Sequence, residues 1–302
     1  MKRAAVILAI LSIAVWAGAQ TSGQPVNQNP SAAGQASAPG ATAPAVKRAP
    51  QAKTQPEFEA YKAAAANTDP AALEKAADDF ATKFPDSELR LLLYKVDLRL
   101  YQNANNADKS ETIGRKVLSL DGDDPEALYI VAEVIAEKTH DTDIDKDQHF
   151  AEAAAMAQKA TQTVDTDIPV PAGTPQDKID AYKGLLRSNA YSILGTIEFK
   201  KENYAAAQEN LQKSIDAFPS NPDPVVVLRL ALAIDKQATA AVDRDKPLAD
   251  KLYADALKVA NRAVALTQDN TPIGTPARHE RDRLQGLTGG AAPAQPQTPP
   301  KN

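Results

Sequence analysis

One stretch in the second half of the chain combines small, aromatic and aliphatic residues at spacings that fit two antiparallel helices. Gly195 and Ala207 carry little or no side chain, which lets the two helices approach closely. Tyr191 and Leu194 fall within one turn of the glycine and fill the space beside that contact. Pro219 cannot continue a helix and ends the unit. The stretch predicts a helical hairpin, which cannot bury its apolar face without neighbours.

Similar units follow one another along the chain. Apolar residues recur at intervals of three and four, which is typical of helices. An acidic residue followed by proline combines a capping side chain with a residue suited to the first helical turn. This pair occurs at Asp69-Pro70, Asp124-Pro125 and Asp223-Pro224. We expect about five hairpins in an all-α array, closed by a charged last helix that starts at Thr275 and Pro276.

With Ser188 as position one, the first stretch resembles the tetratricopeptide repeat, a helical hairpin of 34 residues. The residues at its motif positions are Tyr191, Leu194, Gly195, Tyr204, Ala207 and Pro219. Glu198 stands where the motif has an aromatic residue, and Phe199 beside it can take that role. The resemblance implies a right-handed superhelix of antiparallel helical hairpins over residues 55–288, similar to exported bacterial proteins of this family.

Members of that family commonly bind a peptide at positions two, five, nine and thirteen of each first helix. The resemblance therefore implies partner-binding residues on the inner face of two helices. They are Asn189, Ser192, Thr196, Lys200, Glu126, Tyr129, Glu133 and Glu137. The alternative for any one of them is an ordinary exposed polar residue.

The first 19 residues have the three parts of a secretory signal peptide. Lys2 and Arg3 form its basic start, Ala4–Trp16 its apolar region, and small residues ending at Ala19 its cleavage site. The apolar region is shorter than the roughly 20 residues of a membrane span. We expect cleavage after Ala19 and a periplasmic or secreted protein with no membrane span; the alternative is an uncleaved anchor.

Two low-complexity segments flank the predicted repeats. Residues 20–54 and 289–302 are rich in Ala, Pro, Gln and Ser and contain almost no large apolar residue. Such segments cannot bury enough surface to offset the entropy lost on ordering. We expect a disordered linker and a disordered Pro-rich tail around one repeat domain at 55–288.

Composition excludes several classes of function. The chain contains no cysteine, so it has neither disulfides nor thiolate metal sites nor a cysteine nucleophile. The formal net charge is -5, and removal of Lys2 and Arg3 takes it to -7. A negative protein without a basic stripe is not expected to bind nucleic acid or an anionic membrane surface.

An acidic loop is the strongest candidate for metal binding. Its carboxylates have the spacing of a calcium-binding loop, at Asp141, Asp143, Asp145, Asp147 and Glu152. Lys146 stands where such a loop needs glycine, and its charge opposes a cation. The alternative is a solvated acidic loop before the helix near His149. His140 and His149 flank the loop, and His279 lies among charges; we expect neither a metal nor a cofactor.

Three functions remain open. The leading hypothesis is a non-catalytic scaffold of the bacterial cell envelope, which binds a segment of a protein partner in its concave groove. One alternative is an envelope enzyme that acts on peptidoglycan or another glycan, which would need carboxylates facing each other across a cleft. The other is a scaffold that responds weakly to calcium through the loop from Asp141 to Glu152. No serine elbow or histidine dyad favours catalysis.

Overall fold

The computed structural model describes residues 47–170 and 173–289, which form eleven α-helices and no strand. The helices are α1 (Gln55–Ala65), α2 (Pro70–Lys83), α3 (Leu89–Asn103), α4 (Ala107–Leu120), α5 (Pro125–Lys138), α6 (Lys146–Thr163), α7 (Gln176–Lys200), α8 (Tyr204–Ala217), α9 (Pro224–Ala241), α10 (Lys246–Ala265) and α11 (Gly274–Leu287). The prediction of an all-α fold is confirmed.

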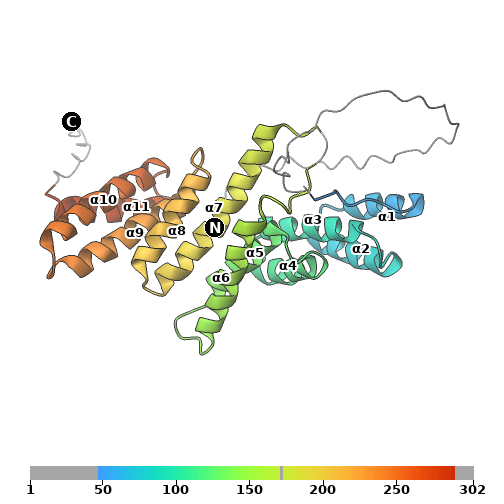
Figure 1. Cartoon of the computed structure of the whole chain (residues 1–302), viewed down its shortest axis with the longest axis horizontal. Coiled ribbons are helices and arrows are strands. Elements are labelled where there is room, and N and C mark those ends of the chain that lie inside the picture. The colour runs from blue at the N-terminus through green and yellow to red at the C-terminus, as the bar shows by residue number, and fades with distance from the viewer. Residues whose placement is uncertain (1–46, 171–172, 290–302) are drawn as a thin grey trace, which may run out of the picture.

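Successive helices pack against one another and form an elongated helical solenoid (Figure 1). Five hairpins, α1/α2 to α9/α10, follow in chain order, and α11 packs on α10 as a final single helix. The first helices of neighbouring hairpins also contact each other, at α1/α3, α3/α5, α5/α7 and α7/α9. The first helices therefore form a continuous layer, which we call the inner face.

The acid-proline pairs begin helices as the sequence predicts. The side chain of Asp69 accepts a hydrogen bond from the backbone of Ala72 at 2.9 Å. The side chains of Asp124 and Asp223 likewise accept hydrogen bonds of 2.8 Å from backbone amides in the first turns of α5 and α9. Each bond satisfies one amide that a helix start would otherwise leave unpaired. The last helix begins at Gly274, one residue before the predicted start.

Glycine permits the close contact between α7 and α8. A β-carbon at Gly195 would lie 2.6 Å from Cγ of Leu211, far inside van der Waals contact. Ala207 and Leu211 are fully buried opposite. Two turns earlier on α7, the carbonyl of Ser188 accepts a hydrogen bond of 2.8 Å from the hydroxyl of Ser214. Gly195 and Ala207 thus both lie at the close contact between the two helices of this hairpin.

The long α7 differs from an ordinary repeat helix. Residues 165–184, here called the insertion, lengthen the connection between α6 and α7 beyond an ordinary turn. The helix α7 begins inside the insertion, at Gln176, and has 25 residues. Asp165 pairs with Arg187 at 2.7 Å and with Lys183 at 3.6 Å, which ties the start of the insertion to α7. The insertion therefore adds turns to the first helix of the fourth hairpin.

Residues 47–54 form an extended segment, here called the strap, that runs along the ends of the first three hairpins. Lys47 donates to Asp121 at 2.5 Å and to Asp167 at 2.9 Å. The other polar contacts are from Arg48 to Glu88, from Lys53 to the carbonyl of Asp86, and between the Thr54 cap and Glu57. Ion pairs thus order the end of the segment predicted to be a disordered linker.

The predicted signal peptide, most of the linker and the tail after Gly289 lie outside the described residues. Within residues 47–170 and 173–289, no helix has both the length and the apolar character needed to cross a bilayer.

Gly195→Ala tests the close contact in the α7/α8 hairpin. The added methyl group should destabilise the chain by roughly 1–3 kcal/mol, because Leu211 and the backbone of α8 must move. Gly286→Ala is the matched control: nothing lies near its β-carbon position, and alanine in an exposed helix should stabilise by about 0.5–1 kcal/mol. Urea unfolding measures both, and equal stabilities of the two variants would contradict the proposed contact.

Candidate binding site on the inner face

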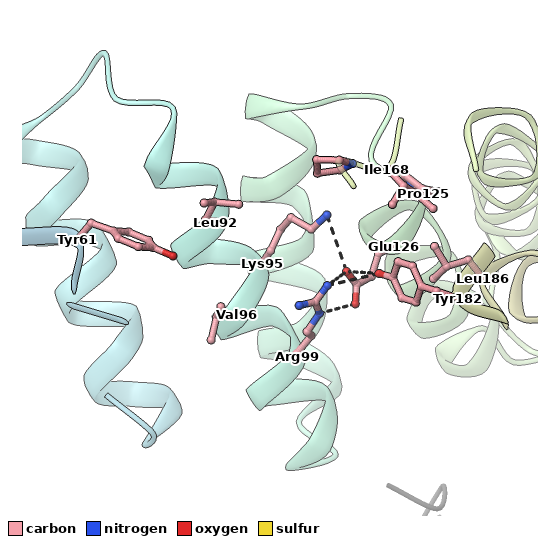
Figure 2. Close-up of a pocket in the computed structure, with 11 residues that line it drawn as sticks. Tyr61, Leu92, Lys95, Val96, Arg99, Pro125, Glu126, Ile168, Tyr182 and Leu186 are labelled. Carbon is pink, nitrogen blue, oxygen red and sulfur yellow. Dashed lines mark hydrogen bonds and ion pairs between the residues drawn. The ribbon is translucent and has the colours of Figure 1, made fainter. Parts of the chain in front are cut away.

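A pocket of about 110 Å³ opens on the inner face between α1, α3, α5, α7 and the segment that leads into α7. We call it the inner-face pocket. Its apolar walls are Leu92, Val96, Ile168, Pro169 and Leu186. Figure 2 shows Tyr61 from α1 and Tyr182 from α7 on opposite sides of the charged residues of the pocket.

An ion pair between α3 and α5 forms the polar part of this pocket. Arg99 binds Glu126 with two hydrogen bonds of 2.6 Å and 2.5 Å, and the hydroxyl of Tyr182 donates to the same carboxylate at 3.1 Å (Figure 2). Burial alone would raise the pKa of Glu126, but Arg99, Lys95 and Tyr182 together lower it below the ordinary value. Glu126 is therefore a buried carboxylate that stays ionised.

Lys95, the second cationic side chain of the pocket, is also paired with a carboxylate. Lys95 donates a short hydrogen bond to Asp124, which also caps α5, and lies 3.9 Å from Glu126. Removing one member of such a buried set would leave an uncompensated charge, which costs about 3–5 kcal/mol. These charges join α3, α5 and α7 and leave no strong unpaired charge for a ligand. The pocket suits an occupant with apolar or neutral polar groups.

The insertion before α7 supplies one side of the pocket. Ile168, Pro169 and Tyr182 all belong to residues 165–184, and they face Lys95 and Arg99 of α3. An ordinary short turn between α6 and α7 would not bring these side chains to α3. The insertion thus supplies one wall of the pocket, and insertions in repeat arrays often lie on a binding face.

A second hollow lies at the other end of the inner face, between α9 and α11. Its volume is about 400 Å³, and it is more open than the first. Leu228 and Leu232 of α9 face Pro276 and His279 of α11 across it. Its exposed surface is mostly apolar, so this hollow also suits an uncharged side chain of a partner.

The residues that line the two hollows share one register. Leu92, Lys95 and Arg99 follow each other at intervals of three and four, as Asn189, Ser192 and Thr196 do on α7. In α9 the same register, with Val227 at position four, places Leu228 at five and Leu232 at nine. The predicted partner-binding positions cover only α5 and α7 and therefore miss these residues; the same positions on α3 and α9 identify them.

On α7, the predicted partner-binding residues are half-buried and already bonded. The hydroxyl of Ser192 donates to the carbonyl of Asn189 at 2.8 Å. Thr196 donates to the carbonyl of Ser192 at 2.7 Å and accepts from Arg229 of α9 at 2.6 Å. These contacts join α7 to α9, so part of the predicted binding surface links helices of the scaffold.

Lys200 caps the C-terminus of α5. Its ammonium group donates to the carbonyl of Ala136 at 2.6 Å and to that of Thr139 at 2.9 Å. Burial and the nearby charge of Arg229 lower the pKa of Lys200. A cation at the end of a helix satisfies carbonyls that have no partner within the helix.

The predicted residues on α5 differ in exposure. Glu126 and Tyr129 are buried, which corrects the expectation that both lie open on the inner face. The physical reason is that α5 is flanked on this side by α3 and by the extended α7, and Arg99 reaches Glu126. Glu133 is half-buried and Glu137 is exposed.

The acidic loop does not gather its carboxylates around one point. Asp143 accepts from the backbone of His140, Asp145 lies 3.3 Å from His149, and Glu152 pairs with Arg115. Asp147 belongs to α6, and Asp141 is exposed. Within residues 47–170 and 173–289, no three His, Asp or Glu side chains are placed to hold a metal ion.

Asp97 is a buried carboxylate on α3 without a hydrogen-bond partner. Burial raises its pKa to about 7, and the neighbouring Glu74 adds to the shift. The facing charged groups are Glu74 and Asp78 of α2 and Lys109 and Lys116 of α4. Glu74 and Asp78 bind the two lysines and the hydroxyls of Tyr101 and Tyr94. Asp97 lines neither hollow, so its protonation concerns packing and not binding.

Comparison with known proteins adds little to this picture. No family model matches the chain, and no curated protein matches it. Among solved structures it is similar to the assembly chaperone of RpL4, Acl4, residues 1–338. That match has a TM-score of 0.37 and 12% sequence identity, and it covers 76% of this chain and 96% of the other. A similarity at this level indicates neither a shared function nor a shared site.

The pH dependence of stability tests the state of Asp97. In the folded chain the carboxyl group of Asp97 keeps its proton up to pH about 7, whereas an aspartate in the unfolded chain loses its proton near pH 4. The contribution of the Asp97 carboxyl to folding stability is therefore fully present below pH 4 and is lost as the pH rises through 7. At pH 8 the free energy of unfolding of Asp97→Asn should exceed that of the wild type by about 1.4 kcal/mol or more, a tenfold change in the unfolding constant. The stability of the variant should also vary less with pH.

Urea unfolding between pH 5 and pH 8 measures this difference. Asp79→Asn on α2 is the control, because Asp79 is exposed and its loss should leave the pH profile unchanged. If the profiles of Asp97→Asn and the wild type run parallel, Asp97 is not the buried acid described here.

Proposed function

We propose that the chain is a non-catalytic scaffold that binds an extended segment of a partner protein along its inner face. One observation carries the proposal: each hollow is lined by a first helix, α3 in one and α9 in the other, through residues at positions five and nine of the repeat register. A partner strand or helix that follows the inner face would meet an apolar hollow at each end. The bonded polar residues of α5, α7 and α9 form the floor between them.

The chemistry of the surface defines the kind of partner segment. The ion pairs of Arg99 and Lys95 are internal to the scaffold, so a strongly charged segment gains little there. Leu228 and Leu232 at one end, and Leu92, Val96 and the two tyrosine rings at the other, favour apolar anchor residues. Anchors that fill hollows contribute most of the binding energy in such complexes.

The repeat class and the cellular location are parts of the same proposal. The gap-free motif from Tyr191 to Pro219 and the recurring register of α3, α5, α7 and α9 support a tetratricopeptide-like array. The basic and apolar start of the chain, with the small residues before Gln20, supports export to the periplasm or beyond. Together they favour a scaffold of the bacterial cell envelope.

Among the residues that the structure describes, neither hollow is lined by the two carboxylates that the glycan-cleaving alternative would need. That chemistry uses two carboxylates flanking a cleft, one of them protonated. The carboxylate of the inner-face pocket, Glu126, is held ionised by Arg99. The protonated candidate, Asp97, lines neither hollow.

Peptide binding to inner-face variants tests the proposal. Peptides are selected by display against the full chain, and their affinities are measured by calorimetry. Leu232→Asp places a charge in the α9/α11 hollow and should weaken binding at least tenfold, about 1.4 kcal/mol. Leu248→Asp, on the second helix α10, is the matched control and should bind as the wild type does, because Leu248 is exposed away from both hollows.

Circular dichroism and thermal melting confirm that both variants are folded. Equal loss of binding in the folded Leu232→Asp and Leu248→Asp variants, or loss in neither, would contradict binding on the inner face.

A further inference from the structure

The strap brings the N-terminal part of the chain to the rim of the inner-face pocket. Lys47 is 2.9 Å from a carboxylate oxygen of Asp167. Asp167 is followed directly by Ile168 and Pro169, which line the pocket. Burial lowers the pKa of Lys47, but its bonds to Asp121 and Asp167 raise it above the ordinary value, so the tether stays charged. The described part of the chain therefore begins, at Lys47, with a side chain bonded to the residue next to the pocket lining.

The sequence before Lys47 has the chemistry that the pocket selects. Residues 20–46 contain no charged side chain, and those nearest the strap, 38–46, read APGATAPAV. Because Arg99 and Glu126 already satisfy each other, a charged occupant would lose its hydration without gaining a free counterion. An uncharged occupant has no such cost.

Size and shape agree with this assignment. A cavity of roughly 150 Å³ holds a benzene molecule, so a pocket of about 110 Å³ has room for a side chain such as valine or proline. Proline-rich segments dock as extended helices against aromatic side chains, and Tyr61 and Tyr182 line this pocket. At roughly 3.1 Å per residue, the three residues from Lys47 back to Pro44 span up to about 9 Å.

We propose that residues 38–46 dock in the inner-face pocket of their own chain and compete with the partner segment. The inference rests on the proposed function, because it names the first occupant of the same surface. A tether of a few residues holds the segment at a millimolar effective concentration. A partner must therefore displace it, and weak or unrelated peptides are excluded.

Disulfide trapping in the full chain tests the docking without any partner. Because the chain has no cysteine, Ala43→Cys with Val96→Cys can form only one intramolecular bond, across the pocket. The control pair is Ala43→Cys with Asp123→Cys, on the exposed loop that also carries Asp121, next to Lys47 but outside the pocket. Docking predicts that the pair with Val96 oxidises at least tenfold faster. Equal rates, or a faster control, would overturn the proposal.

A charged segment separates docking from simple proximity. Pro44→Asp with Val46→Asp leaves Lys47 and the tether in place but puts two carboxylates into residues that should enter the pocket. Trapping to Val96→Cys should slow at least tenfold. A display-selected peptide should bind at least tenfold more tightly to the chain in which Pro44→Asp and Val46→Asp are the only substitutions, because the charged segment no longer competes for the pocket. Unchanged trapping and unchanged affinity would show that the pocket is left open to partners and would overturn the proposal.

The two proposals fail in different ways. Leu232→Asp lies at the far hollow and affects only the partner peptide, so its lack of effect contradicts the scaffold function and not the docking. Trapping involves only residues of this chain, so its failure contradicts the docking and not the scaffold function.

Discussion

The structure depends on close contacts between helices that no single hairpin can complete. Within the fourth hairpin, Gly195 of α7 lets Leu211 of α8 approach its backbone. Between hairpins, a β-carbon at Gly114 of α4 would lie 2.5 Å from Val131 of α5. Each hairpin exposes an apolar face that the next one covers, so the array is stable only as a stack. The inner face is a consequence of this stacking, because it aligns every first helix on one side.

Charge pairs fix that inner face and determine what it can bind. Arg99, Glu126 and Tyr182 come from three successive first helices, and Lys200 of α7 caps α5. Residues that a motif assigns to a partner thus hold neighbouring hairpins together. The surface that we propose for binding is the pair of apolar hollows, one of which is walled in part by Ile168 and Tyr182 of the insertion. Binding and architecture share the same register but use different side chains.

The sequence predicts the fold well and the site only in part. Helix starts at Asp69, Asp124 and Asp223 follow from local chemistry, and so does the contact at Gly195. The burial of Glu126 could not be predicted, because it depends on Arg99, which lies 27 residues away in the sequence. The strap was missed for a similar reason: its composition indicates disorder, but Lys47 meets two carboxylates brought together only by stacking. Leu228 and Leu232, by contrast, can be predicted from the sequence, because they occupy positions five and nine of the repeat motif on α9.

A crystal structure of the chain with a display-selected peptide is the most direct test of binding on the inner face. The account predicts that the peptide lies across the first helices, with apolar side chains in the hollow at Leu228 and Leu232 and against Leu92 and Val96 in the inner-face pocket. A peptide bound on the outer side, along the second helices α2, α4, α6, α8 or α10, would contradict it.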